Sequence, residues 1–479
     1  MEKCDRVNQR QSKGVLLLDH YDELADQLKQ SFRLSGFEGP VVVVSDAGFL
    51  PADVLSLFRW FCTDSDGGAL GEAPEQQRAY RLAHAGWQRG RPRFFNQIEV
   101  PDYWEIRGNN GSGAIHDLNH LRGRIFYGGP SGRRLVSEVD WLNEKGVVRA
   151  TDHYDRRGIL YARTVFNRKG ERFCRTWFDD AGRERVVENA VTRDILVTRR
   201  GKTELFKNRT ALAAAMIREL GGEGQRIFYN SLSTPLFVTE QLACAEGGHV
   251  LFWQEGPRPD IPGNMQMILE GRANTSAIYV QHRDSWEQLI ALGAPAEKVR
   301  PLGFVYPFER TNRRRCDVLI CTNSDQIEQL ETLVTRLPQM TFHIAAVTEM
   351  SSRLLAYGRY ANVRLYPTVR KEVVDELFEK CDYYFDVNHG GEILSSVKRA
   401  FLNNQLILGL EGTLHRRRYT SEMNCFSDAE PLCRLAERLA ADTALFEQHL
   451  NAQREAAMSE SAGAYRRLFA GGKRLDDTI

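Results

Sequence analysis

The chain opens with two short aliphatic runs that flank an amphipathic segment. Residues 15–18 read VLLL and residues 41–44 read VVVV. Short apolar runs of this kind are typical of strands that are buried on both faces. The apolar positions between the two runs recur with helical spacing, at Leu24, Leu28, Phe32 and Leu34. The pattern therefore predicts strand, helix and strand, the unit from which parallel sheets are built.

A different pattern, with alternating polar and apolar residues, occupies the middle of the chain. Residues 159–166 read ILYARTVF and residues 171–178 read ERFCRTWF, so successive side chains would point to opposite faces of a strand. The segments are separated by polar turns that close on regularly spaced glycines, at Gly146, Gly158, Gly170 and Gly182. Glycine adopts the left-handed backbone of a tight hairpin without strain. We predict a meander of antiparallel strands.

The α/β pattern returns after the meander. Residues 210–220 (TALAAAMIREL) predict a helix, and residues 249–255 (HVLFWQE) predict a strand. The simplest organisation is one parallel α/β domain, residues 15–68 and 205–304, interrupted by an inserted β-meander domain, residues 69–204.

A second α/β domain is predicted over residues 305–430, where apolar runs such as 317–322 (DVLICT) alternate with helical segments. C-terminal helices are predicted over residues 431–479. Their apolar positions would share one face of a long helix, at Leu432, Leu435, Leu439, Leu445, Phe446 and Leu450. Residues 1–14 are polar and are expected to form a flexible tail without a secretory signal. The predicted fold class is α/β.

Composition narrows the function classes. The 479 residues are 42% hydrophobic and 27% charged, which is typical of a globular protein. Lys and Arg total 64 and Asp and Glu total 63, so the net charge is +1 and no general nucleic-acid binder is predicted. Basic and aromatic residues do alternate in the meander, but a sheet with one solvated face accounts for that alternation. Aliphatic runs of only four residues predict no membrane-spanning helix.

Cysteine and histidine positions give no sign of a metal or a cofactor. The nine cysteines are scattered without a C-x-x-C pair, as expected for reduced thiols in the cytoplasm. His116 and His120 could share a metal if their segment were helical, but glycines flank it and it has no evident third ligand. We predict neither a metal site nor a cofactor.

One polar turn is a candidate ligand site. Residues 388–392 read NHGGE and join a predicted strand to a predicted helix in the second α/β domain. Its glycines would let a sugar or a phosphate approach the backbone at a helix N-terminus. A plain helix-capping turn explains the same residues equally well. The chain contains no G-x-G-x-x-G, no G-x-x-x-x-G-K-[ST] and no G-x-S-x-G motif.

Several long motifs resemble one family. They are FNQIEVPDYWEIRGNNGSGAI (95–115), VDWLNEKGVVRATDHYDRRG (139–158), RIFYNSLSTPLFV (226–238), IPGNMQMILE (261–270) and DVNHGGEILSSVKRAFLNNQLILGLE (386–411). From about Leu17 to Leu432, the chain resembles the stabilising, acceptor-binding subunit of the accessory-Sec O-N-acetylglucosaminyltransferase of Gram-positive bacteria. The resemblance implies a GT-B-like fold, in which two Rossmann-like domains carry a β-meander inserted in the first.

The resemblance also implies partners and a location. A catalytic paralogue would carry the UDP-GlcNAc chemistry, in a complex of two copies of each subunit. The acceptor would be a serine-rich-repeat adhesin polypeptide that is glycosylated before export. The complex would be cytoplasmic and peripherally associated with the inner face of the membrane.

Four positions distinguish the catalytic subunit from its partner. The resemblance implies that an active member uses an Arg and a Lys to neutralise the diphosphate, and two carboxylates to orient the sugar and the ribose. Here Asn323 and Glu328 occupy the cation positions, and Gly391 and Arg399 occupy the carboxylate positions. A one-residue slip would bring Glu392 into register and restore one carboxylate only. We predict a non-catalytic subunit; the alternative is an active retaining GT-B glycosyltransferase with a divergent donor site.

Two further sets of residues are candidates for binding. Polar residues near strand ends of the first domain are predicted to contact the acceptor polypeptide: Asn230, Ser231, Ser233, Thr234, Trp253, Gln254, Glu255 and Asn264. Trp253 is equally well explained as a core aromatic, and binding of an already glycosylated acceptor remains open. Aromatic residues of the meander are predicted to form the interface with the catalytic subunit: Tyr161, Phe166, Phe173, Trp177 and Phe178.

Overall fold

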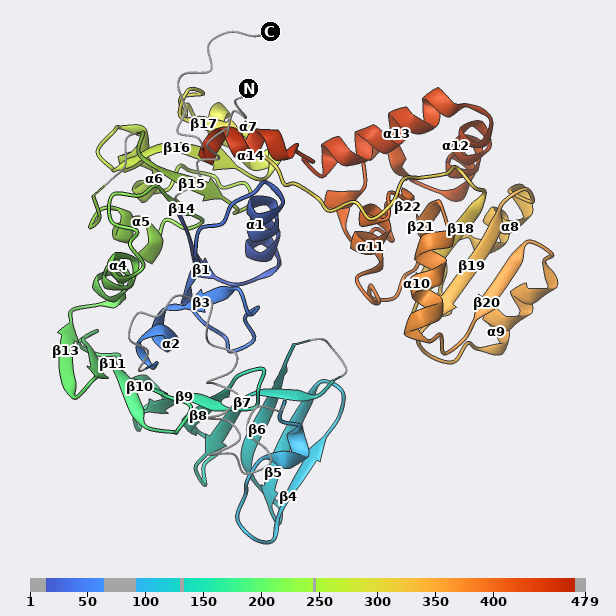
Figure 1. Cartoon of the computed structure of the whole chain (residues 1–479). Coiled ribbons are helices and arrows are strands. Elements are labelled where there is room, and N and C mark those ends of the chain that lie inside the picture. Colours follow the sequence, from blue (N-terminus) through green and yellow to red (C-terminus); the bar gives the residue numbers. More distant parts are fainter. Residues whose placement is uncertain (1–13, 64–91, 130–132, 244–246, 470–479) are drawn as a thin grey trace, which may run out of the picture. The chain divides into compact units, whose positions relative to one another are not determined.

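The chain divides into two compact units, Met1–Pro301 with Arg466–Ile479, and Leu302–Tyr465 (Figure 1). The computed structural model describes residues 14–63, 92–129, 133–243 and 247–469. Each unit contains a parallel sheet with helices packed against it, so the predicted α/β class is confirmed.

The first unit is built on a seven-stranded parallel sheet with the order β17-β16-β15-β14-β1-β2-β3. The aliphatic run at the start of the chain forms β1 (Val15–His20), which lies between β2 (Val41–Ser45) and β14 (Ile227–Tyr229). The other strands are β3 (Val54–Ser56), β15 (His249–Trp253), β16 (Thr275–Val280) and β17 (Val299–Pro301). The helices are α1 (Glu23–Leu34), α2 (Leu57–Phe61), α4 (Arg209–Glu219), α5 (Thr234–Thr239), α6 (Gly263–Leu269) and α7 (Arg283–Ala291).

A ten-stranded antiparallel sheet is inserted between α2 and α4, and its strands follow one another in sequence order (Figure 1). The predicted meander is therefore confirmed. Gly146, Gly158, Gly170 and Gly182 all have positive φ angles, between 74° and 81°, as their hairpin turns require. The strands are β4 (Trp104–Gly108), β5 (Ser112–Asp117), β6 (His120–Gly128), β7 (Leu135–Leu142), β8 (Val148–Tyr154), β9 (Leu160–Phe166), β10 (Arg172–Phe178), β11 (Glu184–Asn189), β12 (Ile195–Arg199) and β13 (Lys202–Phe206).

The inserted sheet shares a hydrophobic core with the unit that it interrupts. Trp177, Val186 and Val197 from the sheet belong to the same buried cluster as Leu57 and Phe58 of α2. Burial of side chains this large is a main source of folding free energy. The inserted residues are continuous in sequence, but around β10, β11 and β12 they share their core with the rest of the first unit.

The second unit contains a six-stranded parallel sheet with the order β20-β19-β18-β21-β22-β23. The strands are β18 (Asp317–Thr322), β19 (Thr341–Ala346), β20 (Val363–Tyr366), β21 (Tyr383–Asp386), β22 (Leu406–Leu410) and β23 (Cys425–Phe426). The helices are α8 (Leu330–Arg336), α9 (Ser352–Leu355), α10 (Lys371–Lys380), α11 (Ser396–Leu402), α12 (Ala429–Ala441), α13 (Thr443–Ala456) and α14 (Ala462–Phe469).

The C-terminal apolar residues form two helices, not the single long helix that their spacing predicts. Asp442 ends α12, and its side chain accepts a hydrogen bond from the backbone N–H of Leu445 to cap α13. Both helices nevertheless bury their apolar faces in the core of the second unit. In the part of the chain that the structure describes, no helix is long and apolar enough to cross a membrane.

The end of α14 belongs to the first unit. The ring of Phe469 lies 5.1 Å from that of Phe32, 5.4 Å from that of Phe37 and 5.7 Å from that of Phe228, measured between centroids. Arg226 holds the same helix end, because its Nη1 donates to the carbonyl of Leu468 at 2.9 Å. The last described residue of the chain therefore completes an aromatic cluster of the N-terminal unit.

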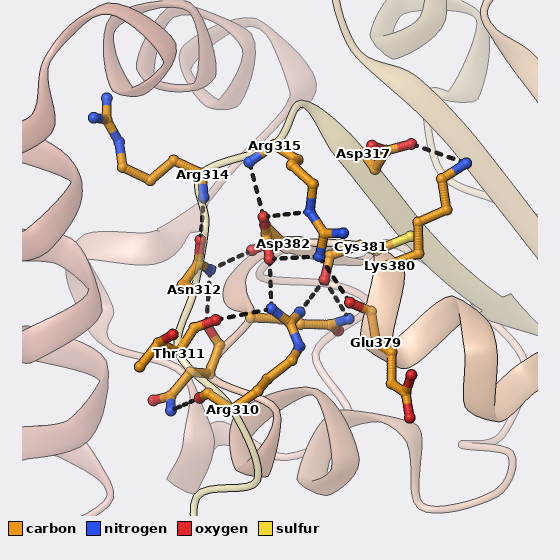
Figure 2. Close-up of polar contacts among 12 residues, drawn as sticks. Arg310, Thr311, Asn312, Arg314, Arg315, Asp317, Glu379, Lys380, Cys381 and Asp382 are labelled. Atoms are coloured by element: carbon orange, nitrogen blue, oxygen red, sulfur yellow. Dashed lines mark hydrogen bonds and ion pairs between the residues drawn. The ribbon is translucent and has the colours of Figure 1, made fainter.

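A buried carboxylate fixes the segment that precedes β18 (Figure 2). Asp382 is fully buried at the start of β21, and its carboxylate accepts from Arg310 Nη1 at 2.5 Å and from Arg315 Nε at 3.0 Å. Asn312 adds a hydrogen bond from Nδ2 to the carbonyl of Asp382 at 2.8 Å. Burial alone would raise the pKa of Asp382, but the hydrogen bonds from Arg315 and Arg310 outweigh it, so the pKa of Asp382 is lowered. We call these four residues the Asp382 clasp.

Candidate functional site

The four positions that the resemblance assigns to a donor site lie in the second unit. Asn323 and Glu328 follow β18, Gly391 follows β21, and Arg399 lies in α11. Because β18 and β21 are adjacent parallel strands, the loops that follow them meet at one edge of the sheet. This is the edge at which parallel α/β proteins bind ligands.

Backbone hydrogen bonds join these two loops. The N–H of Glu328 donates to the carbonyl of Val387 at 2.8 Å, and the N–H of His389 donates to the carbonyl of Gln326 at 3.0 Å. Below them, Thr322 Oγ1 lies 2.5 Å from Asn388 Oδ1 in the buried floor of the site. Some backbone N–H and carbonyl groups of each loop are therefore already hydrogen-bonded to the other loop.

Glu328 is paired within the protein. Its Oε2 lies 2.5 Å from His389 Nε2, and both side chains are partly exposed. The hydrogen bond from His389 lowers the pKa of Glu328, so this carboxylate stays ionised at neutral pH. A negative charge thus stands at the position where the resemblance implies a phosphate-binding lysine, and it would repel a diphosphate.

Asn323 lies against the glycine turn. A Cβ atom on Gly390 would stand 1.9 Å from Asn323 Oδ1, so only glycine permits this approach. On its other side, Asn323 lines a polar cavity of about 170 Å³. The other residues that line it are Ser324, Asp325, Ala346, Thr348, Glu349, Met350 and Leu354. Its charged residues are acidic, which again disfavours a phosphate group.

Arg399 makes structural contacts with α10. Its guanidinium lies 2.5 Å from Asp375 Oδ1 and 4.1 Å from the ring centroid of Phe378. A cation held over an aromatic ring and paired with a carboxylate packs two neighbouring helices together. At the position where the resemblance implies a carboxylate, the chain therefore carries a cation that is paired within the fold.

Glu392, which a one-residue slip would bring into register, also serves the fold. Its Oε1 accepts from the backbone N–H of Val397 at 3.0 Å, in the first turn of α11. Its Oε2 accepts from Arg416 Nε at 2.5 Å. Of the two interpretations of residues 388–392, these contacts favour a turn that caps a helix.

A histidine that the sequence analysis missed holds this turn in place. His415 Nδ1 lies 2.5 Å from Asp386 Oδ1, and its Nε2 lies 2.5 Å from the carbonyl of Gly390. The hydrogen bond to Asp386 raises the pKa of His415 to about 9. No local motif marks this pair, because Asp386 ends β21 whereas His415 lies in the loop that follows β22.

The acceptor candidates of the first unit lie at the carboxyl edge of its sheet. Asn230 Nδ2 donates to Gln254 Oε1 at 2.9 Å, and Gln254 Nε2 donates to Gln281 Oε1 at 2.9 Å. The backbone N–H of Asp19 donates to Asn230 Oδ1 at 3.0 Å. These side chains form a continuous amide row across the ends of β1, β14, β15 and β16. The structure thus brings together two of the predicted residues, Asn230 and Gln254.

The remaining acceptor candidates fall into two groups. Ser231, whose Oγ donates to Asp19 Oδ2 at 3.2 Å, is half-buried, and Ser233 and Glu255 are exposed. Thr234 begins α5, and Asn264 donates to the carbonyl of Leu232 at 3.0 Å. Trp253 is only 2% exposed and belongs to the hydrophobic core. Its interpretation as a core aromatic is therefore the one that the structure supports.

The five interface candidates are not equivalent. Trp177 is 2% exposed and stacks on Phe58 with ring centroids 3.9 Å apart, and Tyr161 is buried and donates to the carbonyl of Asp46. Both side chains are buried within the chain, because α2 covers this face of the sheet. Phe166 and Phe178 are half-buried, and Phe173 is 51% exposed. Among the five, Phe173 presents the largest exposed fraction.

The HDLNH segment forms a hairpin. His116 lies in β5 and His120 begins β6, so the two imidazoles do not share a helical face. No group of three or more His, Cys, Asp or Glu side chains suited to a metal ion occurs among the residues that the structure describes.

Comparison with solved structures identifies the fold. The chain is similar to a chain of the "Crystal structure of GtfA/B complex bound to UDP and GlcNAc", with 35% identity, a TM-score of 0.82, and coverage of 95% of this chain and 98% of that chain. A chain of accessory secretory protein 1, 2 and 3 from Streptococcus pneumoniae shares the fold at 9% identity and a TM-score of 0.57. Two Rossmann-like units with a β-meander inserted in the first define a GT-B-like protein.

Sequence comparison then gives the family. Domain models match at residues 15–61 (GtfB N-terminal domain), 104–207 (GtfB middle domain), 209–292 (GtfB third domain) and 318–453 (GftB/GlyA-F C-terminal domain). The stabilizing protein GtfB of UDP-N-acetylglucosamine–peptide N-acetylglucosaminyltransferase from Streptococcus agalactiae is 37% identical, covering 95% of this chain and 99% of that protein. Its Limosilactobacillus reuteri counterpart is 33% identical over 95% of this chain and 98% of its own length. The chain belongs to the GtfB stabilizing-protein family.

Proposed function

We propose that the chain is the non-catalytic, stabilising subunit of a UDP-GlcNAc:polypeptide O-N-acetylglucosaminyltransferase complex. Relatives of nearly equal length are named as stabilizing proteins of such a transferase, and a similar chain occurs in a GtfA/B complex. The observation that carries the proposal is the pairing of Glu328 with His389, at a position where the resemblance implies a phosphate-binding cation. The other three positions also lack the required charges.

The acceptor would be a serine-rich-repeat polypeptide held by the first unit. An extended Ser/Thr-rich chain offers few apolar anchors, so its recognition depends on hydrogen bonds to backbone and hydroxyl groups. In the amide row, Gln254 and Gln281 are buried and hydrogen-bonded within the fold, and they orient the partly exposed Asn230. Ser231 and Ser233 lie next to that row in sequence and complete a polar surface. We further propose a complex with two copies of each subunit, on the cytoplasmic face of the membrane.

Co-expression with the catalytic subunit tests the partnership. Phe173 is an exposed aromatic on an inserted sheet whose edges lack further strands in the described part of the chain. We expect the wild-type chain to co-purify with the catalytic subunit and Phe173→Ser to reduce the recovered complex by about tenfold, since exposed aromatics often dominate interfaces. Size-exclusion chromatography of the tagged complex provides the measurement.

Leu355→Ser is the matched control, because Leu355 is similarly exposed but lies in the second unit. If the wild-type chain and the catalytic subunit elute separately, the proposed partnership is wrong. If both variants retain the complex, Phe173 is not part of the interface.

Fluorescence polarisation with a labelled Ser/Thr-rich peptide tests acceptor binding. We expect the purified chain to bind the unmodified peptide without UDP-GlcNAc, because the amide row lies in the unit that lacks the donor-site loops. A Ser231→Ala, Ser233→Ala double variant should weaken binding roughly 3- to 10-fold through lost hydrogen bonds. Ser352→Ala, an exposed serine of the second unit, should leave the affinity unchanged. Binding that strictly requires UDP-GlcNAc would contradict this part of the proposal.

A further inference from the structure

Phe237 is an exposed aromatic residue on α5, the helix that follows the predicted acceptor residues Ser231 and Ser233. Its side chain is 42% exposed. In the part of the chain that the structure describes, the other exposed Phe, Tyr and Trp side chains all lie in or next to the inserted sheet: Phe94, Tyr103, Phe126 and Phe173. Phe237 therefore stands apart from the aromatic residues of the inserted sheet.

Helical geometry places the Phe237 ring close to Ser233. Ser233 is the N-cap of α5, and the N–H of Phe237, four positions later, donates to the Ser233 carbonyl at 3.5 Å. Residues four apart share one helix face, with Cβ atoms about 5–6 Å apart, and helical side chains lean toward the N-terminus. Ser233 and Phe237 are both exposed, and the residues that α5 buries are Pro235, Leu236, Val238 and Thr239. The hydroxyl and the ring are therefore neighbours on the solvent-facing side of α5.

The hydroxyl of Ser233 is not used by the fold. A serine at an N-cap usually accepts a hydrogen bond from the first turn of its helix, but the Ser233 side chain accepts none. Its backbone N–H is engaged instead, and donates to Ser231 Oγ at 3.2 Å. No other described group pairs with the Ser233 hydroxyl. This hydroxyl can therefore donate to a ligand and accept from it.

The segments that carry Ser233 and Phe237 and their neighbours are uncharged. Residues 230–239 (NSLSTPLFVT) and 261–269 (IPGNMQMIL) contain no Asp, Glu, Lys or Arg, although 27% of the chain is charged. Asn264 joins the two segments, because its Nδ2 donates to the carbonyl of Leu232 at 3.0 Å. A charged partner would lose hydration here without gaining a counter-ion, whereas an uncharged Ser/Thr-rich chain would not. The proposed acceptor is therefore the occupant that suits these segments.

We propose that Ser233 and Phe237 form a subsite that selects threonine over serine in the acceptor polypeptide. The inference rests on the proposed function, which places the acceptor on the first unit. A threonine side chain carries a hydroxyl and a methyl group on one carbon. The hydroxyl would hydrogen-bond to Ser233 Oγ, and the methyl group would lie on the Phe237 ring, out of water. Serine offers the hydroxyl only, and removal of one methyl group from water corresponds to about a fourfold gain in affinity.

Fluorescence polarisation with two labelled peptides measures this selectivity on the full chain. The peptides have the same sequence, except that every hydroxyl residue is threonine in one and serine in the other. The wild-type chain should prefer the threonine peptide by about fourfold. Phe237→Ser should bind both peptides equally, because the apolar contact is removed. Phe237→Leu keeps an apolar side chain and should retain most of the preference.

Two further variants separate the ring from the hydroxyl and from general surface effects. Leu34→Ser is the matched control, because Leu34 is 44% exposed and ends another helix of the first unit. It should keep the wild-type preference. Ser233→Ala removes the hydroxyl but keeps the ring, so it should weaken the binding of both peptides by about threefold while the preference for threonine remains.

The possible failures are distinct. If neither peptide binds, the proposed acceptor function fails and this inference fails with it. If both peptides bind the wild-type chain with equal affinity, the acceptor function stands and only the threonine subsite is wrong. If the threonine preference survives in Phe237→Ser while co-purification with the catalytic subunit is lost, the ring belongs to the interface with that subunit and the proposal is overturned.

Discussion

Asp382→Asn should lower the free energy of unfolding of the second unit by about 3–5 kcal/mol, the usual consequence of removing one partner from a buried ion pair. The substitution keeps the shape of the side chain but removes the buried charge that pairs with Arg310 and with the partly exposed Arg315 (Figure 2). Urea denaturation of the full chain, followed by circular dichroism, measures the loss.

Glu430→Gln is the matched control for this measurement. Glu430 forms a close ion pair with Arg336, but both side chains are more than 40% exposed, so the change should cost no more than about 1 kcal/mol. Equal stabilities of the Asp382→Asn variant and the wild-type chain would show that the Asp382 clasp does not stabilise the unit.

The second large effect concerns catalysis. The purified chain should transfer no detectable GlcNAc from UDP-GlcNAc to a Ser/Thr-rich peptide, and it should not bind UDP measurably in calorimetry. The physical reason is electrostatic: where the resemblance implies two cations, the chain has Glu328, which is negative, and Asn323, which is uncharged. The catalytic subunit, assayed under the same conditions, is the positive control.

A charge-restoring variant makes this prediction sharper. Asn323→Arg combined with Glu328→Lys should introduce weak UDP binding without transfer, because Gly391 and Arg399 still supply no carboxylate. Turnover by the wild-type chain, once contaminating transferase is excluded, would instead favour an active enzyme with a divergent donor site.

The parts of the fold that local patterns determine were predictable from the sequence. Aliphatic runs such as residues 15–18 can only be buried, and the hairpin glycines require a left-handed backbone. The break at Asp442 was missed, although an aspartate that caps a helix is a local signal. The shared core was missed for a different reason, since Phe58 and Trp177 meet only in the folded chain.

The candidate site also has some features that the sequence predicts and others that only the folded structure shows. The identities of Asn323, Glu328, Gly391 and Arg399 could be read from motifs that resemble a family. Their partners could not, because the ion pairs of Glu328 and Arg399 join residues from different elements.

The docking of Phe469 in the first unit has a consequence for synthesis on the ribosome. The aromatic cluster formed by Phe32, Phe37 and Phe228 is completed by a residue that is translated after the second unit. While the second unit is still being made, these N-terminal rings lack their final cover. The nascent protein would therefore expose an aggregation-prone surface until α14 has been translated. Truncations that remove the end of α14 would leave that exposure permanent.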